Sequence, residues 1–208
     1  MATVLYLQAS PRKPQESYSS RAANAFIKAY SKLHPGDQVV TRNLFDPSLP
    51  EFNQVAADGK YAIMHGKPHT PEQAAAWRGV EKEAAAFKAA DKIVLAAPMW
   101  NFGIPYRLKQ YLDVMVQPTL TFSFDPVKGY DGLVKGKPVL LVLARGSEYP
   151  AGSPVDFQLP YLKFIFQFIG FTDIRTLLVE PALASGLEVA AAKLAAAIQQ
   201  APALAATF

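Results

Sequence analysis

The first residues that could do chemistry lie directly after a short apolar run, TVLYLQ. That run is followed by a set of hydroxyl and basic side chains: Ser10, Arg12, Ser17, Tyr18, Ser19 and Ser20. The set precedes an amphipathic pattern, and a helix N-terminus offers free amides and partial positive charge to an anion. Because an N-cap needs only one hydroxyl, the surplus of donors favours a phosphate site over a cap alone.

The same segment lacks the patterns of the common nucleotide-binding loops. Neither G-x-G-x-x-G nor G-x-x-x-x-G-K-[ST] occurs in it, so neither a dinucleotide fingerprint nor a Walker loop explains the hydroxyls. We therefore expect the bound group to be a monophosphate.

A second cluster follows the apolar run KIVLAAP and consists of Pro98, Met99, Trp100, Asn101 and Phe102. Wide aromatic side chains flank a carboxamide and several backbone amides just before another helical pattern. Flat rings pack on rings, and amides read the edge of a heterocycle, so the cluster suits a planar ligand. The alternative is that the aromatic residues belong to the core and Asn101 to a turn.

A third cluster, Ala144, Arg145, Gly146 and Ser147, follows the apolar run PVLLVLA. Gly146 permits close approach of the backbone to a ligand, and Arg145 could supply a cation. The alternative is a surface turn with an exposed arginine.

Regular patterns predict the elements that position these clusters. Apolar runs predict five strands, at residues 3 to 8, 37 to 44, 92 to 98, 138 to 144 and 171 to 180. Amphipathic patterns predict five helices, at residues 20 to 33, 71 to 90, 105 to 116, 159 to 169 and 186 to 200. Residues 45 to 70 show no sustained period and predict a long loop, whereas residues 119 to 137 predict a hairpin or flap.

The alternation of strands and helices implies a parallel sheet covered on both faces. We expect one α/β domain over residues 1 to 208, with a flavodoxin-like, doubly wound, five-stranded parallel sheet. In such sheets ligands bind beyond the carboxyl ends of the strands, so the three clusters should converge.

Composition limits the partners and the compartment. The net charge of +4 comes from scattered basic residues, which disfavours nucleic acid. The chain has no cysteine, which excludes disulfides and thiolate chemistry and fits a reducing compartment. The first residues lack a basic segment before the apolar run, and the alanine-rich C-terminal pattern predicts an amphipathic helix rather than a membrane span. We expect a cytoplasmic protein.

The histidines predict no metal site. His65 and His69 are four residues apart, but Gly66 and Pro68 interrupt the helix that would bring them together. We expect His34, His65 and His69 to lie in exposed loops.

Taken together, the clusters resemble the FMN-containing azoreductases, also described as FMN-dependent NADH:quinone oxidoreductases. The likeness covers essentially the whole chain. It rests on ASPR with the Ser-x-Ser at residues 17 to 19, then PMWNFGIPYRLKQYLD, TFSFDPVKGYDGLVKGK, ARGSEY and PYLKFIFQFIGFTDI, in that order.

The resemblance implies FMN as the bound cofactor. It implies that Ser10 and the segment from Ser17 to Ser19 hold the phosphate, with Arg12 and Tyr18 beside it. It also implies that residues 98 to 102 line the isoalloxazine ring and that residues 144 to 147 close its other edge.

The resemblance further implies a ping-pong reaction in which NADH or NADPH reduces the flavin and a quinone or aromatic azo compound then reoxidises it. The cofactor carries the chemistry, so we expect no catalytic side chain, although Arg145 could stabilise the reduced ring. We expect an aromatic roof of Phe102, Phe124 and Tyr149. The apolar helix near residue 160 predicts a homodimer in which Ile165 lines the partner's active site.

Four features depart from the family pattern. The phosphate loop is one residue longer than usual, and Trp100 replaces the usual tyrosine. The turn reads Ala-Arg-Gly-Ser instead of Ser-Arg-Gly-Gly, and Tyr149 stands where relatives sometimes have histidine. These changes bear on substrate range and on the redox properties of the flavin.

Two other functions are compatible with a phosphate site in this fold. A flavodoxin-like electron carrier would pass single electrons to protein partners, but such carriers are usually acidic, whereas this chain is net positive. A flavin-free protein that binds another phosphate compound is the third alternative.

Overall fold

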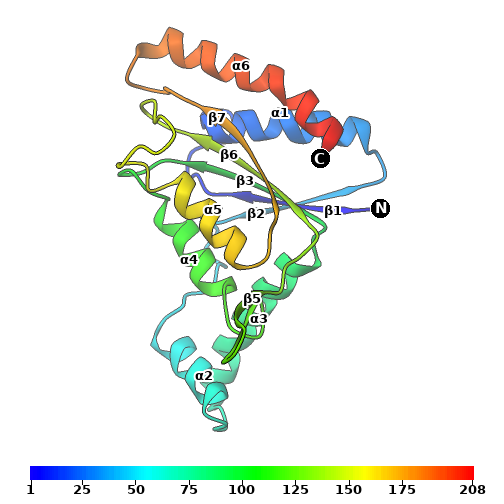
Figure 1. Ribbon diagram of the computed structural model, residues 1–208, viewed down its shortest axis with the longest axis vertical. Helices are drawn as coiled ribbons and strands as arrows, with labels where there is room; N and C mark the ends of the chain where they lie inside the picture. The colour runs from blue at the N-terminus through cyan, green and yellow to red at the C-terminus, as the bar shows by residue number, and fades with distance from the viewer.

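A five-stranded parallel sheet runs through the centre of the computed structural model, which describes all residues from 1 to 208 (Figure 1). Its strands are β1 (Thr3–Gln8), β2 (Gln38–Asn43), β3 (Lys92–Pro98), β6 (Pro138–Ala144) and β7 (Asp173–Val179). They lie in the order β2-β1-β3-β6-β7, and every neighbouring pair is parallel. The central strand β3 is buried from Ile93 to Ala97, as expected for a strand covered on both faces. The predicted doubly wound, flavodoxin-like sheet is confirmed.

Helices cover both faces of the sheet (Figure 1). One face carries α1 (Tyr18–Leu33) and α6 (Gly186–Thr207), and the other carries α3 (Pro71–Ala89), α4 (Tyr106–Met115) and α5 (Leu159–Phe168). The chain leaves β1 toward α1 but leaves β3 toward α4, on the opposite face. The crevice between the carboxyl ends of β1 and β3 is therefore the topological switch point, where such sheets bind ligands.

The prediction of a long loop over residues 45 to 70 was wrong. This region contains α2 (Gln54–Met64), which begins where the side chain of Asn53 accepts a hydrogen bond from the amide of Ala56 at 3.2 Å. The helix packs on α3 through Ala56, Gly59 and Ala62, which are too small to give a clear apolar period. A Cβ at Gly59 would lie 3.3 Å from the carbonyl oxygen of Gln73, so this glycine permits close helix packing. The molecule thus has six helices instead of the expected five.

The C-terminal helix is longer than expected. We predicted its end near residue 200, but α6 continues through Pro202 to Thr207 because Ala201, Ala205 and Phe208 remain buried against α1. By length and composition alone α6 could cross a membrane. In the fold its alanine face lies on α1, as the predicted amphipathic pattern requires.

The predicted flap is an antiparallel hairpin formed by β4 (Phe122–Asp125) and β5 (Gly129–Gly132). It lies against the end of α5, where the amide of Val134 donates to the carbonyl of Ile169 at 2.8 Å. A Cβ at Gly132 would lie 2.3 Å from the backbone nitrogen of Gly170, so only glycine allows this approach. The position of Phe124 therefore depends on contact between the hairpin and α5.

Candidate functional site

The loops after β1, β3 and β6 enclose one cavity of about 210 Å³ at the switch point. Eleven of the predicted cofactor-binding residues line it: Ser10, Arg12, Ser17, Tyr18, Ser19, Pro98, Met99, Trp100, Ala144, Arg145 and Gly146. Ladder hydrogen bonds continue past the strand ends, with the amide of Ala9 bound to Ala96 and that of Met99 bound to Ala144. These bonds hold the three loops at one edge of the sheet.

The first loop presents buried hydroxyls at the start of α1. Ser17 is the N-cap and accepts a hydrogen bond from the amide of Ser20, while its hydroxyl lies 3.2 Å from that of Ser19. By helix geometry the amides of Tyr18 and Ser19 have no intrahelical acceptor. No acidic residue occupies the first turn of the helix, where a carboxylate would compete with a bound anion.

Basic charge is available at the mouth of the same loop. Arg12 is exposed and forms no ion pair, and its backbone amide donates to the hydroxyl of Ser10. The hydroxyls of Ser10, Ser17 and Ser19 are buried, but together they make only local hydrogen bonds. This donor set suits a phosphate group.

The second loop is a strained two-residue turn. The amide of Trp100 donates to the carbonyl of Gly103 at 3.0 Å, and the amide of Gly103 donates to the carbonyl of Trp100 at 2.9 Å. Both residues between them are left-handed, Asn101 with φ of 46° and Phe102 with φ of 66°. Asparagine tolerates this conformation, but phenylalanine does so at a cost of about 1–2 kcal/mol. The turn leaves the carboxamide of Asn101 without a protein partner.

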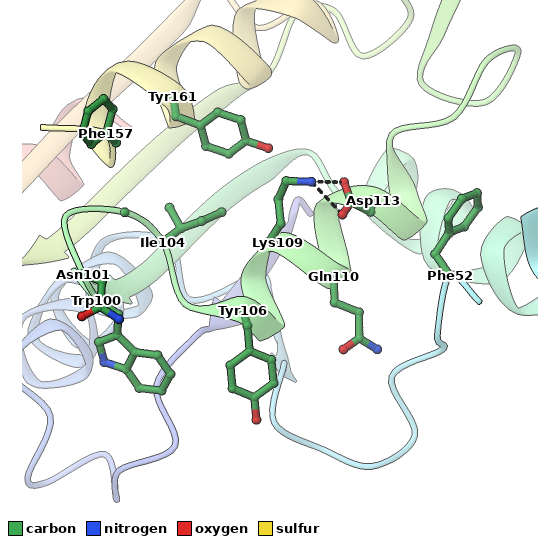
Figure 2. A pocket seen from close by; sticks show the side chains of 11 residues that line it. Phe52, Trp100, Asn101, Ile104, Tyr106, Lys109, Gln110, Asp113, Phe157 and Tyr161 are labelled. Carbon is green, nitrogen blue, oxygen red and sulfur yellow. Dashed lines mark hydrogen bonds and ion pairs between the residues drawn. The ribbon is translucent and has the colours of Figure 1, made fainter. Parts of the chain in front are cut away.

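A larger groove of about 810 Å³ adjoins the cavity (Figure 2). Trp100 lines both hollows, and Asn101 lines only the groove. Several aromatic side chains border the groove: Phe52, Trp100, Tyr106, Phe157 and Tyr161. Burial raises the pKa of Tyr161, which keeps its hydroxyl neutral. The planar ligand expected at the second loop therefore has aromatic surface beside it.

Arg145 is buried, with 1% of its side chain exposed, so the exposed-arginine alternative is wrong. Its guanidinium pairs with Asp156 at 3.1 Å and with Glu180 at 3.3 Å. Its Nε also donates to the side chain of Gln158 at 3.2 Å. The cation is thus compensated by two carboxylates, and it is not a free charge of the kind expected for stabilising a reduced ring.

Six predicted residues lie outside the cavity: Asn101, which borders the groove, and five others. Ser147 is exposed beyond the third loop, Phe102 is 52% exposed on the turn, and Phe124 is 60% exposed on the hairpin. Tyr149 packs its ring 5.6 Å from the guanidinium carbon of Arg145. Ile165 is partly buried against the core on α5. One chain therefore does not assemble the expected aromatic roof.

Sequence reasoning missed several residues at the site. Ala182 and Leu183 complete the cavity from the segment after β7, where the amide of Ala182 donates to the carbonyl of Arg145. Gln158 is fully buried between the second and third loops. The one sequence signal for Gln158 is its position as a polar residue at the start of an otherwise apolar helical pattern.

The histidines lie apart from the site. His65 follows the end of α2, and the ring of His69 lies 2.8 Å from the carbonyl oxygen of Gly59. His34 is partly buried beside Tyr30, with ring centroids 4.5 Å apart, and His69 is partly buried as well, so neither has the exposed position that we expect from the sequence.

Replacing Phe102 with glycine should stabilise the protein, because glycine adopts the left-handed conformation without strain. At protein concentrations low enough to keep the chain monomeric, we expect Phe102→Gly to raise the free energy of unfolding by about 1 kcal/mol in urea titrations of the flavin-free protein. Asn101→Gly is the matched control and should change it by less. A loss of stability in Phe102→Gly would show that the ring packs usefully despite its exposure.

Comparisons with known proteins agree with this geometry. Residues 2 to 204 match a family model described as a flavodoxin-like fold. The chain is 51% identical to an FMN-dependent NADH:quinone oxidoreductase of Nitratidesulfovibrio vulgaris, over 100% of both chains. Its structure matches an azoreductase from Bacillus anthracis str. Sterne with a TM-score of 0.91 at 30% identity, over 100% of both chains. It also matches an FMN-dependent NADH-azoreductase from Bacillus anthracis str. Ames Ancestor in complex with FMN, with a TM-score of 0.85 at 25% identity, over 99% of this chain and 100% of the other. The chain belongs to the flavodoxin-like family of FMN-dependent NADH:quinone oxidoreductases and azoreductases.

Proposed function

We propose that this protein is an FMN-dependent oxidoreductase that transfers electrons from NADH or NADPH to quinones and aromatic azo compounds. The observation that carries the proposal is the convergence of three loops on one cavity, with buried hydroxyls at one side and aromatic surface at the other. Family membership and the FMN complex of a structural relative support the same conclusion.

The phosphate of FMN would bind at the start of α1. The hydroxyls of Ser10, Ser17 and Ser19 and the amides of Tyr18 and Ser19 can donate to it, and Arg12 can neutralise it from the cavity mouth. Because these donors come from a helix end and a capped loop, they are ordered before the ligand arrives. Little conformational entropy is lost on binding.

The ring would bind against the second and third loops. Pro98, Met99 and Trp100 would border it, Asn101 offers a free carboxamide from the adjoining groove, and the amide of Gly146 donates to no protein acceptor. Bound FMN supplies two-electron chemistry, accepting hydride from a nicotinamide and passing reducing equivalents to an acceptor. The protein orients the ring and excludes water from one of its faces.

Apart from the phenol of Tyr18, which lies at the proposed phosphate end, the cavity offers no side chain suited to proton transfer. It contains no histidine, aspartate, glutamate or lysine among its lining residues. General acid or base catalysis relies on such groups with a pKa near the working pH. We therefore assign no catalytic residue, and protons consumed by a quinone would come from solvent at the open groove.

We also propose that the protein works as a homodimer in the cytoplasm. Large apolar side chains are exposed around the groove, on α5 and on the hairpin: Phe102 at 52%, Tyr106 at 64%, Phe124 at 60%, Tyr130 at 64%, Phe157 at 62% and Phe164 at 64%. Such a patch is unusual on a monomer. A second copy would cover it and complete the aromatic roof that one chain leaves open, with Ile165 near the partner's cavity. The absence of cysteine suits a reducing compartment.

Turnover with purified protein tests the function. The FMN-loaded protein should oxidise NADH or NADPH rapidly when menadione is present, and initial rates at several menadione concentrations should give parallel double-reciprocal lines, because the donor leaves before the acceptor binds. A protein that holds FMN but gives no turnover would instead be an electron carrier. A protein that binds no FMN would contradict both flavin functions.

Removing one buried hydroxyl tests the phosphate site. Ser19→Ala should raise the dissociation constant for FMN about tenfold, because a hydrogen bond to a charged group is lost. The constant for riboflavin, which has no phosphate, should stay unchanged. Ser31→Ala, on the exposed far end of α1, is the control and should leave both constants unchanged. Equal weakening of FMN and riboflavin by Ser19→Ala would place the phosphate elsewhere.

A charge on the apolar patch tests the dimer. We expect light scattering of the eluted wild type to give twice the mass of 22.7 kDa and Phe164→Glu to give the monomer mass. Burying an unpaired carboxylate in an apolar interface is costly. Leu33→Glu changes an exposed apolar position at the far end of α1, 53% exposed, and should remain dimeric. A monomeric wild type would overturn this part of the proposal.

A further inference from the structure

Gln158 bridges the ends of two neighbouring strands from a completely buried position. Its Nε2 donates to the carbonyl of Pro98 at 2.8 Å, at the end of β3. Its Oε1 accepts from Nε of Arg145 at 3.2 Å, directly after β6. The donor and acceptor partners fix the orientation of the carboxamide, because a carbonyl only accepts and a guanidinium only donates.

The Arg145 side of this bridge is held by charge. Asp156 pairs with the guanidinium through one carboxylate oxygen and accepts the amides of Gln158 and Leu159 through the other, at 2.9 and 3.1 Å. Glu180, which follows β7, pairs with the same guanidinium. The charges thus fix Arg145 from two directions, and the start of α5 is fixed with it.

The same segment also supports the strained turn. The amide of Phe157 donates to the carbonyl of Phe102 at 3.0 Å. Residues 156 to 158 therefore contact the second loop at two points, Pro98 and Phe102, and the third loop at Arg145. Pro98 and Arg145 both line the cavity, so a shift in this segment would move both of its walls.

We propose that Gln158 is a positioning residue for the flavin ring: its carboxamide fixes the separation of the second and third loops, and Arg145 serves the bridge as a buried anchor. This inference rests on the proposed function, because it takes the cavity to be the flavin site. It assigns Arg145 a role in the scaffold that differs from direct stabilisation of the reduced ring.

Gln158 has a matched counterpart that serves as a control. Gln117 is also buried, with 2% exposed, and its Nε2 also donates to a backbone carbonyl, that of Asp113. It lies after α4 and lines neither the cavity nor the groove. Substituting both glutamines with methionine removes the same chemical group at similar volume, at the site in one case and away from it in the other.

The test measures binding of FMN and riboflavin to the flavin-free protein by fluorescence titration. Gln158→Met should raise both dissociation constants by the same factor, about tenfold, because the ring is common to both ligands. It should also change the visible circular dichroism of bound FMN. Gln117→Met should leave the constants and the spectrum unchanged. Gln158→Asn, a smaller change, should give the same pattern more weakly, and it provides the measurement if the methionine variant fails to fold.

Three outcomes would overturn the inference, and they are distinguishable. Wild-type flavin affinity and spectrum in folded Gln158 variants, even with lower stability, would give this residue a purely structural role. Weaker binding of FMN with unchanged riboflavin binding would place its influence at the phosphate. Failure of the wild type itself to bind either flavin would defeat the proposed function and this inference with it.

Discussion

The site depends on the register of the ladders at the carboxyl end of β3. The strand lies between β1 and β6, and hydrogen bonds to both neighbours continue beyond its regular part, through Ala9 to Ala96 and Met99 to Ala144. A one-residue slip in either pairing would turn the lining side chains to the other face of the sheet. The buried apolar runs of β3 and β6 prevent such a slip, because each side chain already fills a place in one of the two cores.

That constraint explains why the fold could be predicted from the sequence to a large extent. Continuous apolar runs indicate strands that are buried on both faces of the sheet, and amphipathic patterns indicate the helices that cover those faces. The prediction failed at α2, where Ala56, Gly59 and Ala62 form a helix contact from residues with almost no apolar signal. The interaction that stabilises α2 is close backbone approach to α3, which depends on a partner distant in sequence.

The candidate site was predictable in its location but only partly in its interactions. Residues adjoining strand ends, such as Ser10, Met99 and Gly146, could be assigned because topology alone brings them together. The buried, paired role of Arg145 could not be predicted, since its environment comes from Asp156 and Glu180, which belong to other loops. A single sequence does not show whether a charged side chain points outward or into a buried network.

The burial of Arg145 also changes what electrostatics can contribute to the reaction. A free guanidinium beside the ring would favour a negatively charged ligand state, but two paired carboxylates remove that advantage. In the proposed binding mode, the polar groups left to contact the ring are neutral: the carboxamide of Asn101, from the groove, and the amide of Gly146. Neutral dipoles that are held in place stabilise developing charge without the desolvation cost of a buried ion. The scaffold holds them in place, because the buried bridge at Gln158 and the hydrogen bond from Phe157 to Phe102 offset the strain of the left-handed turn. We therefore infer that Arg145, the one buried cation, orders the second and third loops. That order would position the neutral polar groups at the edge of the cavity.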